Sequence, residues 1–149
     1  MEPTVNWKGL MDNKLRRTIV ESPLFKHLAE EDLNALVDAS EVVEYEEGDS
    51  VIKEGSKVEH LFIVVEGRVR VWTHTGDRDV ELKNLGPGAY FGEVSLLSGK
   101  DATANVDVRS DEATLIALKR QRILDLVKSD ERVRKMLEGV TLARAKDTI

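Results

Sequence analysis

The sequence predicts an α+β fold in which short helices flank an antiparallel β-roll or barrel. Apolar residues recur every three to four positions near both ends of the chain, but every second position between residues 41 and 118. Glycine-containing turn segments separate most of the alternating runs. A chain of 149 residues, 41% of them hydrophobic, can form one domain with its own core.

Two helices are predicted before the β-rich segment. Met11, Leu15 and Ile19 recur every four residues and give the first helix one apolar face. The segment 22–25 interrupts this pattern, and a second helical pattern follows over residues 28–39. The apolar face of this second helix is formed by Leu28, Leu33, Leu36 and Val37.

Seven short runs rich in β-branched residues follow, and they predict the strands of the roll. They lie at residues 41–46, 50–53, 60–66, 68–74, 79–85, 104–108 and 113–118. Glycines at positions 48, 55, 67, 76, 86 and 88 lie between runs, where the backbone must reverse or take a positive φ. In the run 68–74, alternation predicts that Val69 and Val71 point inward and that Arg68 and Arg70 point outward.

Two further helices are predicted after the last strand. The first is marked by Ile123, Leu126 and Val127. The second carries an apolar stripe with i, i+3, i+4, i+7 spacing, formed by Val133, Met136, Leu137 and Val140. This stripe must be covered, and two possibilities remain open: packing on the roll of the same chain, or contact with a second copy or a protein partner.

The charge of the chain argues against nucleic-acid binding, because a formal net charge of −6 repels a phosphate backbone. The charge is uneven: residues 119–149 carry 9 Lys and Arg against 5 Asp and Glu, whereas residues 1–118 carry 13 against 23. This basic end is either an ordinary solvated helix face or a docking surface for an acidic partner.

Several classes of site are not supported by the residues. The chain has no cysteine, so disulfides, thiolate catalysis and thiolate metal sites are excluded. His27, His60 and His74 are scattered without a His-x-His pair, and no G-x-S-x-G motif occurs, so neither a metal site nor an enzyme is predicted. No stretch is long and apolar enough to span a membrane and no signal peptide is visible, so the expected location is cytoplasmic.

The segment FGEVSLLSGKDATANV, residues 91–106, carries the strongest indication of a binding site. It reads as a strand end at Phe91 that turns at Gly92 into one or two helical turns. Such a turn points backbone N–H groups at whatever lies in front of it, which favours an anion. The Glu93 carboxylate can accept hydrogen bonds from vicinal sugar hydroxyls, or it can simply stabilise the helix dipole.

Six segments between about Ser22 and Leu137 resemble the cyclic-nucleotide-binding domain family, found in catabolite activators and protein-kinase-A regulatory subunits. They are SPLFKHL, EEDLNAL, YEEGDSVIKEGS, LFIVVEGRVRV, LGPGAYFGEVSLLSG and LKRQRILDLV, in the order and at the spacing of the family. The resemblance implies an eight-stranded, jelly-roll-like β-roll with N-terminal helices, a short cassette helix and C-terminal helices. It divides the chain into a helical lead-in at 1–21, the domain at 22–137 and a helix end or tail at 138–149.

The resemblance also implies a phosphate-binding cassette in residues 91–106. Its ligand-binding positions are Phe91, Gly92, Glu93, Val94, Ser95, Ala102 and Thr103. In the family Glu93 takes a ribose hydroxyl, and an arginine preceded by proline pairs with the cyclic phosphate. Here those two positions are Ala102 and Asp101, so the arginine is missing and a carboxylate stands beside its place.

Two functions follow from this pattern. The first is a non-enzymatic regulatory or scaffolding module that binds cyclic nucleotides weakly or not at all and acts through a protein partner. The second is a genuine small-ligand sensor that binds cyclic AMP, cyclic GMP or a nucleoside-like ligand through backbone amides, Glu93 and Thr103. No cofactor is expected in either case.

Overall fold

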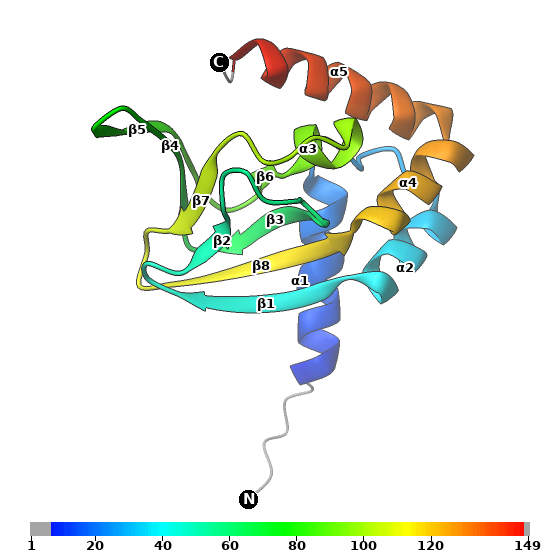
Figure 1. Ribbon diagram of the computed structural model, residues 1–149. Coiled ribbons are helices and arrows are strands. Elements are labelled where there is room, and N and C mark those ends of the chain that lie inside the picture. Colours follow the sequence, from blue (N-terminus) through cyan, green and yellow to red (C-terminus); the bar gives the residue numbers. More distant parts are fainter. Residues whose placement is uncertain (1–6, 148–149) are drawn as a thin grey trace, which may run out of the picture.

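The computed structural model describes residues 7–147, with side chains described for residues 13–139. Helices and strands follow one another as predicted, with helices at both ends and strands between them (Figure 1). The helices are α1 (Trp7–Glu21), α2 (Glu30–Ala39), α3 (Glu93–Ser98), α4 (Arg120–Ser129) and α5 (Glu131–Asp147). The strands are β1 (Glu41–Glu46), β2 (Ser50–Ile52), β3 (His60–Glu66), β4 (Val69–Thr75), β5 (Arg78–Leu85), β6 (Tyr90–Phe91), β7 (Asn105–Val108) and β8 (Glu112–Lys119).

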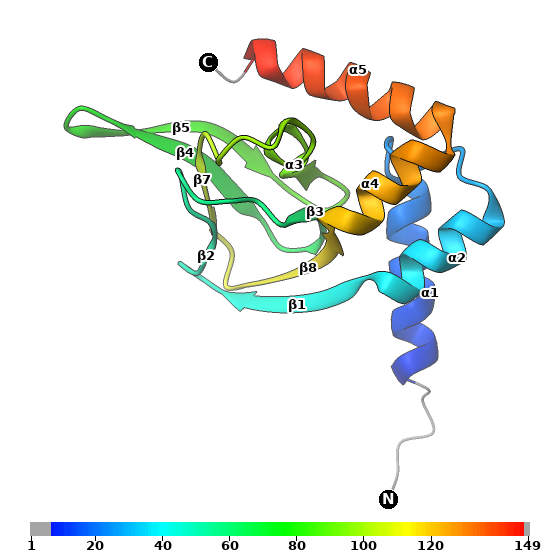
Figure 2. The same ribbon diagram turned by 45° about the vertical axis from the view of Figure 1, so that its right-hand side comes forward.

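The eight strands form two four-stranded antiparallel sheets, in the orders β1-β8-β3-β6 and β2-β7-β4-β5. The two sheets face each other and form the roll. α1, α2 and α4 gather at one side of it, whereas α5 extends across the top over α3 (Figure 2). The prediction of an α+β fold with an eight-stranded β-roll is therefore confirmed. The short β6 is the one strand beyond the seven predicted runs, and it is the strand end expected at Phe91.

Two apolar cores lie on opposite faces of the first sheet. The inner core fills the roll, and the outer core lies between this sheet and the helices. In β3, Phe62 and Val64 belong to the inner core, whereas Leu61 and Ile63 belong to the outer one. Both faces of β3 and β8 are therefore buried, which explains why their sequences read as nearly continuous apolar runs.

The helices cover the outer face of the first sheet. α1 packs against α2 and β3, and α4 packs against α5 and β8. In α5, Val133 and Leu137 are buried in the outer core, so this part of the predicted stripe is covered by the chain itself. Met136 is 38% exposed, and the side chain of Val140 lies outside the described residues.

The predicted division of the chain remains a prediction, but the helix ends bear on it. α1 ends at Glu21, where the lead-in was placed, whereas α5 runs through the predicted boundary at residue 137 without a break. None of the described helices is long and apolar enough to cross a bilayer.

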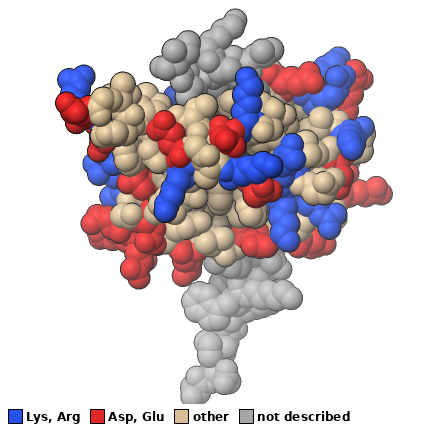
Figure 3. Space-filling model, in the orientation of Figure 1, with Lys and Arg blue, Asp and Glu red and all other residues tan. Residues whose placement is uncertain are grey.

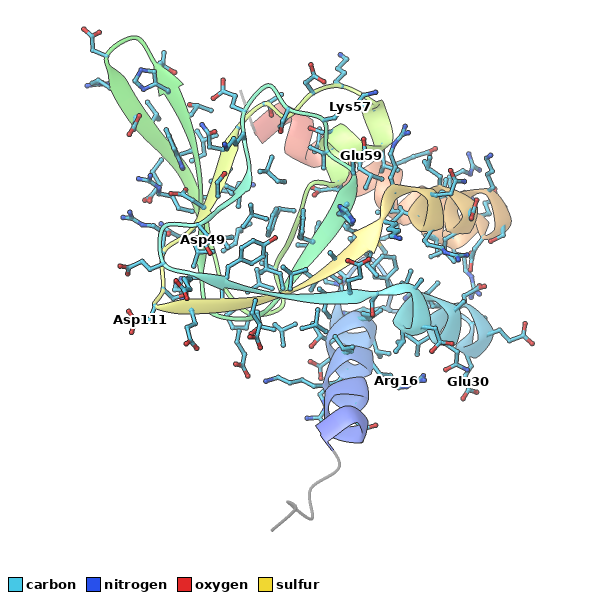
Figure 4. All side chains as sticks on the ribbon, turned by 60° about the horizontal axis from the view of Figure 1, so that its bottom comes forward. Arg16, Glu30, Asp49, Lys57, Glu59 and Asp111 are labelled. Carbon is cyan, nitrogen blue, oxygen red and sulfur yellow. The ribbon has the colours of Figure 1, made fainter. Side chains whose placement is uncertain are left out.

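Basic and acidic side chains are interspersed over much of the face seen in Figure 3, with acidic side chains gathered at its lower left. Asp49 and Asp111 lie together at the end of the roll remote from α4, in the turns that follow β1 and β7 (Figure 4). The pKa of Tyr45, on the adjoining strand, is raised by burial and by the negative charge of Asp49.

Candidate functional site

A cavity of about 150 Å³ lies inside the roll, next to the cassette helix α3. Three parts of the chain form its walls: the strands β4 and β5, the segment from Phe91 into α3, and the segment leading into β7. The lining residues are Ile52, Val58, Val71, Leu82, Lys83, Leu85, Phe91, Gly92, Glu93, Val94, Ser95, Ala102, Thr103, Ala104 and Val106. Most of them are apolar, so the cavity suits a ligand with an apolar body and few polar groups.

Gly92 makes the sharp turn from β6 into α3 possible. Its φ is +94°, in the left-handed region that residues with a Cβ rarely adopt. A Cβ at this position would also lie 2.9 Å from the carbonyl oxygen of His60, so the two backbone segments approach too closely for a side chain. The predicted tight turn at Gly92 is therefore present. It connects the end of β6 at Phe91 directly to the start of α3 at Glu93.

Glu93 follows in the first turn of α3 and is only 2% exposed. Glu93 is one of the residues that line the cavity. The first backbone N–H groups of a helix have no intrahelical acceptor, so this end of α3 offers donors beside a buried acceptor. Val94 and Ser95, in the same turn, also line the cavity.

Phe91 lines the cavity at the end of β6. It is 4% exposed, and its ring stacks on that of Phe62 with 5.2 Å between the ring centroids. The contact fixes the last residue of β6 against β3, to which it is also paired in the sheet. The position of the cassette therefore depends on the inner core of the roll.

Ala102 also lines the cavity and is 7% exposed. Its N–H donates to the carbonyl of Ser56 and its carbonyl accepts from the N–H of Gly55, both at 2.8 Å. The Cβ of Ala102 lines the cavity as part of the inner core, so the position that the resemblance assigns to an arginine does face the cavity. The uncharged side chain of Ala102 therefore brings no positive charge to the cavity.

The two neighbours of Ala102 are both exposed, but only one of them lines the cavity. Thr103 is exposed at the rim and lines the cavity, whereas Asp101 is exposed and does not line it. The expected carboxylate beside the phosphate position is therefore directed toward solvent, where its charge is screened. Lys100 and Arg109 are exposed and outside the lining as well.

The wall formed by β4 and β5 was not predicted from the sequence. Val71, Leu82, Lys83 and Leu85 contribute to it, and Lys83 is half-buried. The sequence of β5 contains only part of the signal: Lys83 has the same parity as Leu85, but Leu82, of the opposite parity, also lines the cavity where the register with β4 shifts. Only the pairing of β5 with β4 shows that this face borders the cassette.

The segment before β3 and the start of α4 support the cassette from outside. Lys57 and Glu59 lie beside α3 in Figure 4, and the carbonyl of Glu59 accepts from the N–H of Arg120 at 2.9 Å. α5 packs over α3, as Figures 1 and 2 both show. Among the described residues, no group of three or more potential metal ligands gathers at this site or elsewhere.

Comparisons with known proteins agree with this fold. The family model of the cyclic nucleotide-binding domain matches residues 42–130. The human cGMP-dependent protein kinase 2 is 32% identical over 130 residues, covering 86% of this chain and 17% of the kinase. The chain therefore spans only about a sixth of that relative.

Solved structures show the same fold. The regulatory domain of Toxoplasma gondii PKA, crystallised with cAMP, superposes with a TM-score of 0.75 at 30% identity, covering 81% of this chain and 46% of that one. The regulatory subunit of a cAMP-independent protein kinase A from Trypanosoma cruzi, bound to guanosine, superposes with a TM-score of 0.73 at 19% identity, covering 83% and 43%.

Proposed function

The chain belongs to the cyclic nucleotide-binding domain family, and we propose that it is a non-catalytic regulatory module whose pocket holds cyclic nucleotides weakly. Its output passes to a protein partner. The observation that carries this proposal is the alanine at position 102, buried in the wall of a cavity that Gly92, Glu93 and Thr103 also line.

The expected loss of affinity is large. A hydrogen bond to a charged group contributes about 1.5–3 kcal/mol, and a guanidinium paired with a phosphate makes two such bonds. The methyl group of Ala102 supplies neither. Without them, affinity for a cyclic phosphate falls by roughly a hundredfold or more.

The packing of the C-terminal helices supports regulation through a partner. α5 packs against α3, so a change at the cassette reaches a helix whose basic residues extend to the surface. Several of these, including Arg132, Arg134 and Lys135, form ion pairs with acidic residues of α5 or with Asp130 before it. A partner would therefore recognise a surface of mixed charge.

The experiment that tests this function is a calorimetric titration with cyclic AMP and cyclic GMP. We expect dissociation constants no better than about the high micromolar range, from the loss of the guanidinium contacts. Submicromolar binding of either nucleotide would contradict the proposal.

A second candidate is a sensor for a nucleoside-like ligand. It is favoured by the combination of apolar walls with the buried carboxylate of Glu93, which suits sugar hydroxyls and needs no phosphate. The Trypanosoma cruzi protein holds guanosine in the same fold. In this case guanosine or adenosine binds more tightly than the matching cyclic nucleotide in the same titration.

A further inference from the structure

A small notch lies where the segment between α1 and α2 meets the first turns of α5. Figures 1 and 2 both show this segment beside the start of α5. The volume of the notch is about 20 Å³, so it admits the end of one small side chain. Its lining residues are Pro23, Leu24, Lys26, His27, Arg132, Val133 and Met136, and it shares none of them with the cassette cavity.

The two sides of the notch are anchored in the outer core. On one side, Leu24 and the adjacent Phe25 are buried there, at 2% and 1% exposure. On the other side, Val133 and Leu137 are buried in the same core, at 4% and 1% exposure. The notch is therefore preformed, which reduces the entropy cost of ordering its walls around a ligand.

Every ionisable residue that lines the notch is basic. Lys26 and His27 follow directly after the buried Phe25, and both are exposed. Among the ion pairs of the described side chains, none involves Lys26 or His27. The charge on this side of the notch thus has no counter-charge within the described part of the chain.

The third basic residue, Arg132, has a carboxylate nearby, but that carboxylate is engaged by the helix backbone. Asp130 accepts from the N–H groups of Arg132 and Val133 at 2.9 and 3.3 Å, and so caps α5. The Nε of Arg132 lies 3.9 Å from it, and the Arg132 side chain is 71% exposed, where an ion pair contributes little. Arg132 therefore stays available to a ligand.

The notch differs in charge from the rest of α5. Arg134 pairs with Glu131 and Glu138, and Lys135 pairs with Glu131. An anionic ligand is consequently drawn to the notch more than to the neighbouring turns of the helix. The chain as a whole carries a net charge of −6, which repels an anionic membrane or a nucleic acid and favours a short anionic segment instead.

We propose that the notch binds an acidic segment of a protein partner. One small apolar side chain of that segment enters the recess, and its carboxylates pair with Lys26 and Arg132. This inference rests on the proposed output through a protein partner, and it adds the chemistry of the partner and the surface that it contacts. Because α5 packs against α3, the partner contacts the helix that lies next to the cassette.

The test is a titration of the isotope-labelled full chain with the peptide Glu-Glu-Val-Glu-Glu, followed through the amide chemical shifts. We expect the largest changes at residues 23–27 and 132–136, on the two sides of the notch. The peptide Gln-Gln-Val-Gln-Gln should bind about fivefold more weakly, because it cannot form the surface ion pairs. Salt should weaken binding of the acidic peptide for the same reason.

Reversing the charges of the notch should reverse its preference. Lys26→Glu with Arg132→Glu should lose the acidic peptide and bind Lys-Lys-Val-Lys-Lys, because both residues are exposed and the buried Leu24 and Val133 are unchanged. Circular dichroism melts establish that each variant is folded. If the double variant does not fold, Lys26→Gln, at an exposed position outside the helices, should still weaken binding of the acidic peptide.

Lys53→Glu with Arg109→Glu is the matched control. It changes the net charge by the same amount at two exposed residues of the roll that do not line the notch. This variant should keep the preference for the acidic peptide. Equal weakening by the two double variants would show a response to net charge alone and would refute the notch as the site.

Two other results would overturn the inference. One is the absence of shift changes at the notch with the acidic peptide. The other is binding to phosphatidylserine vesicles without binding to the peptide, which would indicate a membrane surface. Cyclic-nucleotide titration judges the proposed function separately: weak nucleotide binding without peptide binding removes only the notch, whereas submicromolar nucleotide binding with peptide binding at the notch removes only the weakly binding pocket.

Discussion

Arg120, the first residue of α4, donates from its Nε to the carbonyl oxygen of Leu96 in α3 across 3.1 Å. The bond joins residues 24 positions apart and satisfies a carbonyl near the end of the cassette helix, where intrahelical donors run out. A terminal Nη of Arg120 also lies 3.9 Å from where a Cβ on Gly99 would stand, so the guanidinium covers the end of α3. Arg120 therefore connects the cassette to the C-terminal helices.

Removing this contact should loosen the cassette. We expect Arg120→Ala to lower the free energy of unfolding by about 1–3 kcal/mol, because a partly buried hydrogen bond from a charged donor is lost. Arg122→Ala is the control, since Arg122 is exposed on the same helix, and it should change stability by less than about 0.5 kcal/mol. Urea unfolding measures both, and equal effects would show that the bond to Leu96 contributes nothing.

Gly92 and Gly88 allow backbone strain to be separated from steric exclusion. Both have φ near +90°, but a Cβ at Gly92 meets the His60 carbonyl at 2.9 Å, whereas a Cβ at Gly88 meets nothing within 4 Å. We expect Gly88→Ala to cost about 1–3 kcal/mol from the positive φ, and Gly92→Ala to cost clearly more. Thermal melts of the two variants measure both losses of stability. A Gly92→Ala protein as stable as the Gly88→Ala protein would mean that the close contact with the His60 carbonyl is readily relieved.

The stripe on α5 should stabilise the chain itself. Leu137 is 1% exposed in the outer core, so Leu137→Ala should lower stability by about 2–5 kcal/mol. Met136, at 38% exposure, is the neighbouring control, and Met136→Ala should cost much less. If light scattering shows that Leu137→Ala mainly reduces the apparent mass while the melting temperature stays unchanged, the stripe serves self-association instead.

Restoring the family pattern at positions 101 and 102 tests whether Ala102 is an isolated loss. Asp101→Pro with Ala102→Arg should raise cyclic-nucleotide affinity about a hundredfold, because the guanidinium gains two charge-assisted bonds. Asp101→Pro alone should recover little, since Asp101 is exposed outside the cavity lining. Glu93→Ala in the restored protein should lose part of the gain. A folded double variant without any gain in calorimetry would show that the cassette differs in more than its charge.

The sequence by itself determined the order and type of the elements. Alternation from Glu41 onward predicted the strands, and the spacing of Leu15 and Ile19 predicted the buried face of α1. The sequence also predicted the turn at Gly92, because a glycine between a strand end and a short helical run indicates a sharp change of backbone direction. These features depend on local periodicity and on backbone conformation, which a sequence records directly.

The tertiary structure alone decided which residues share the cavity and which do not. Lys83 and Glu93 lie on different elements, and only the pairing of β5 with β4 brings the lysine to the same cavity as the cassette. Asp101 stands next to Ala102 in sequence, yet Ala102 is buried and lines the cavity, whereas Asp101 is exposed and does not line it. The composition of the site depends on strand register and side-chain direction across long sequence separations, and no local pattern specifies those.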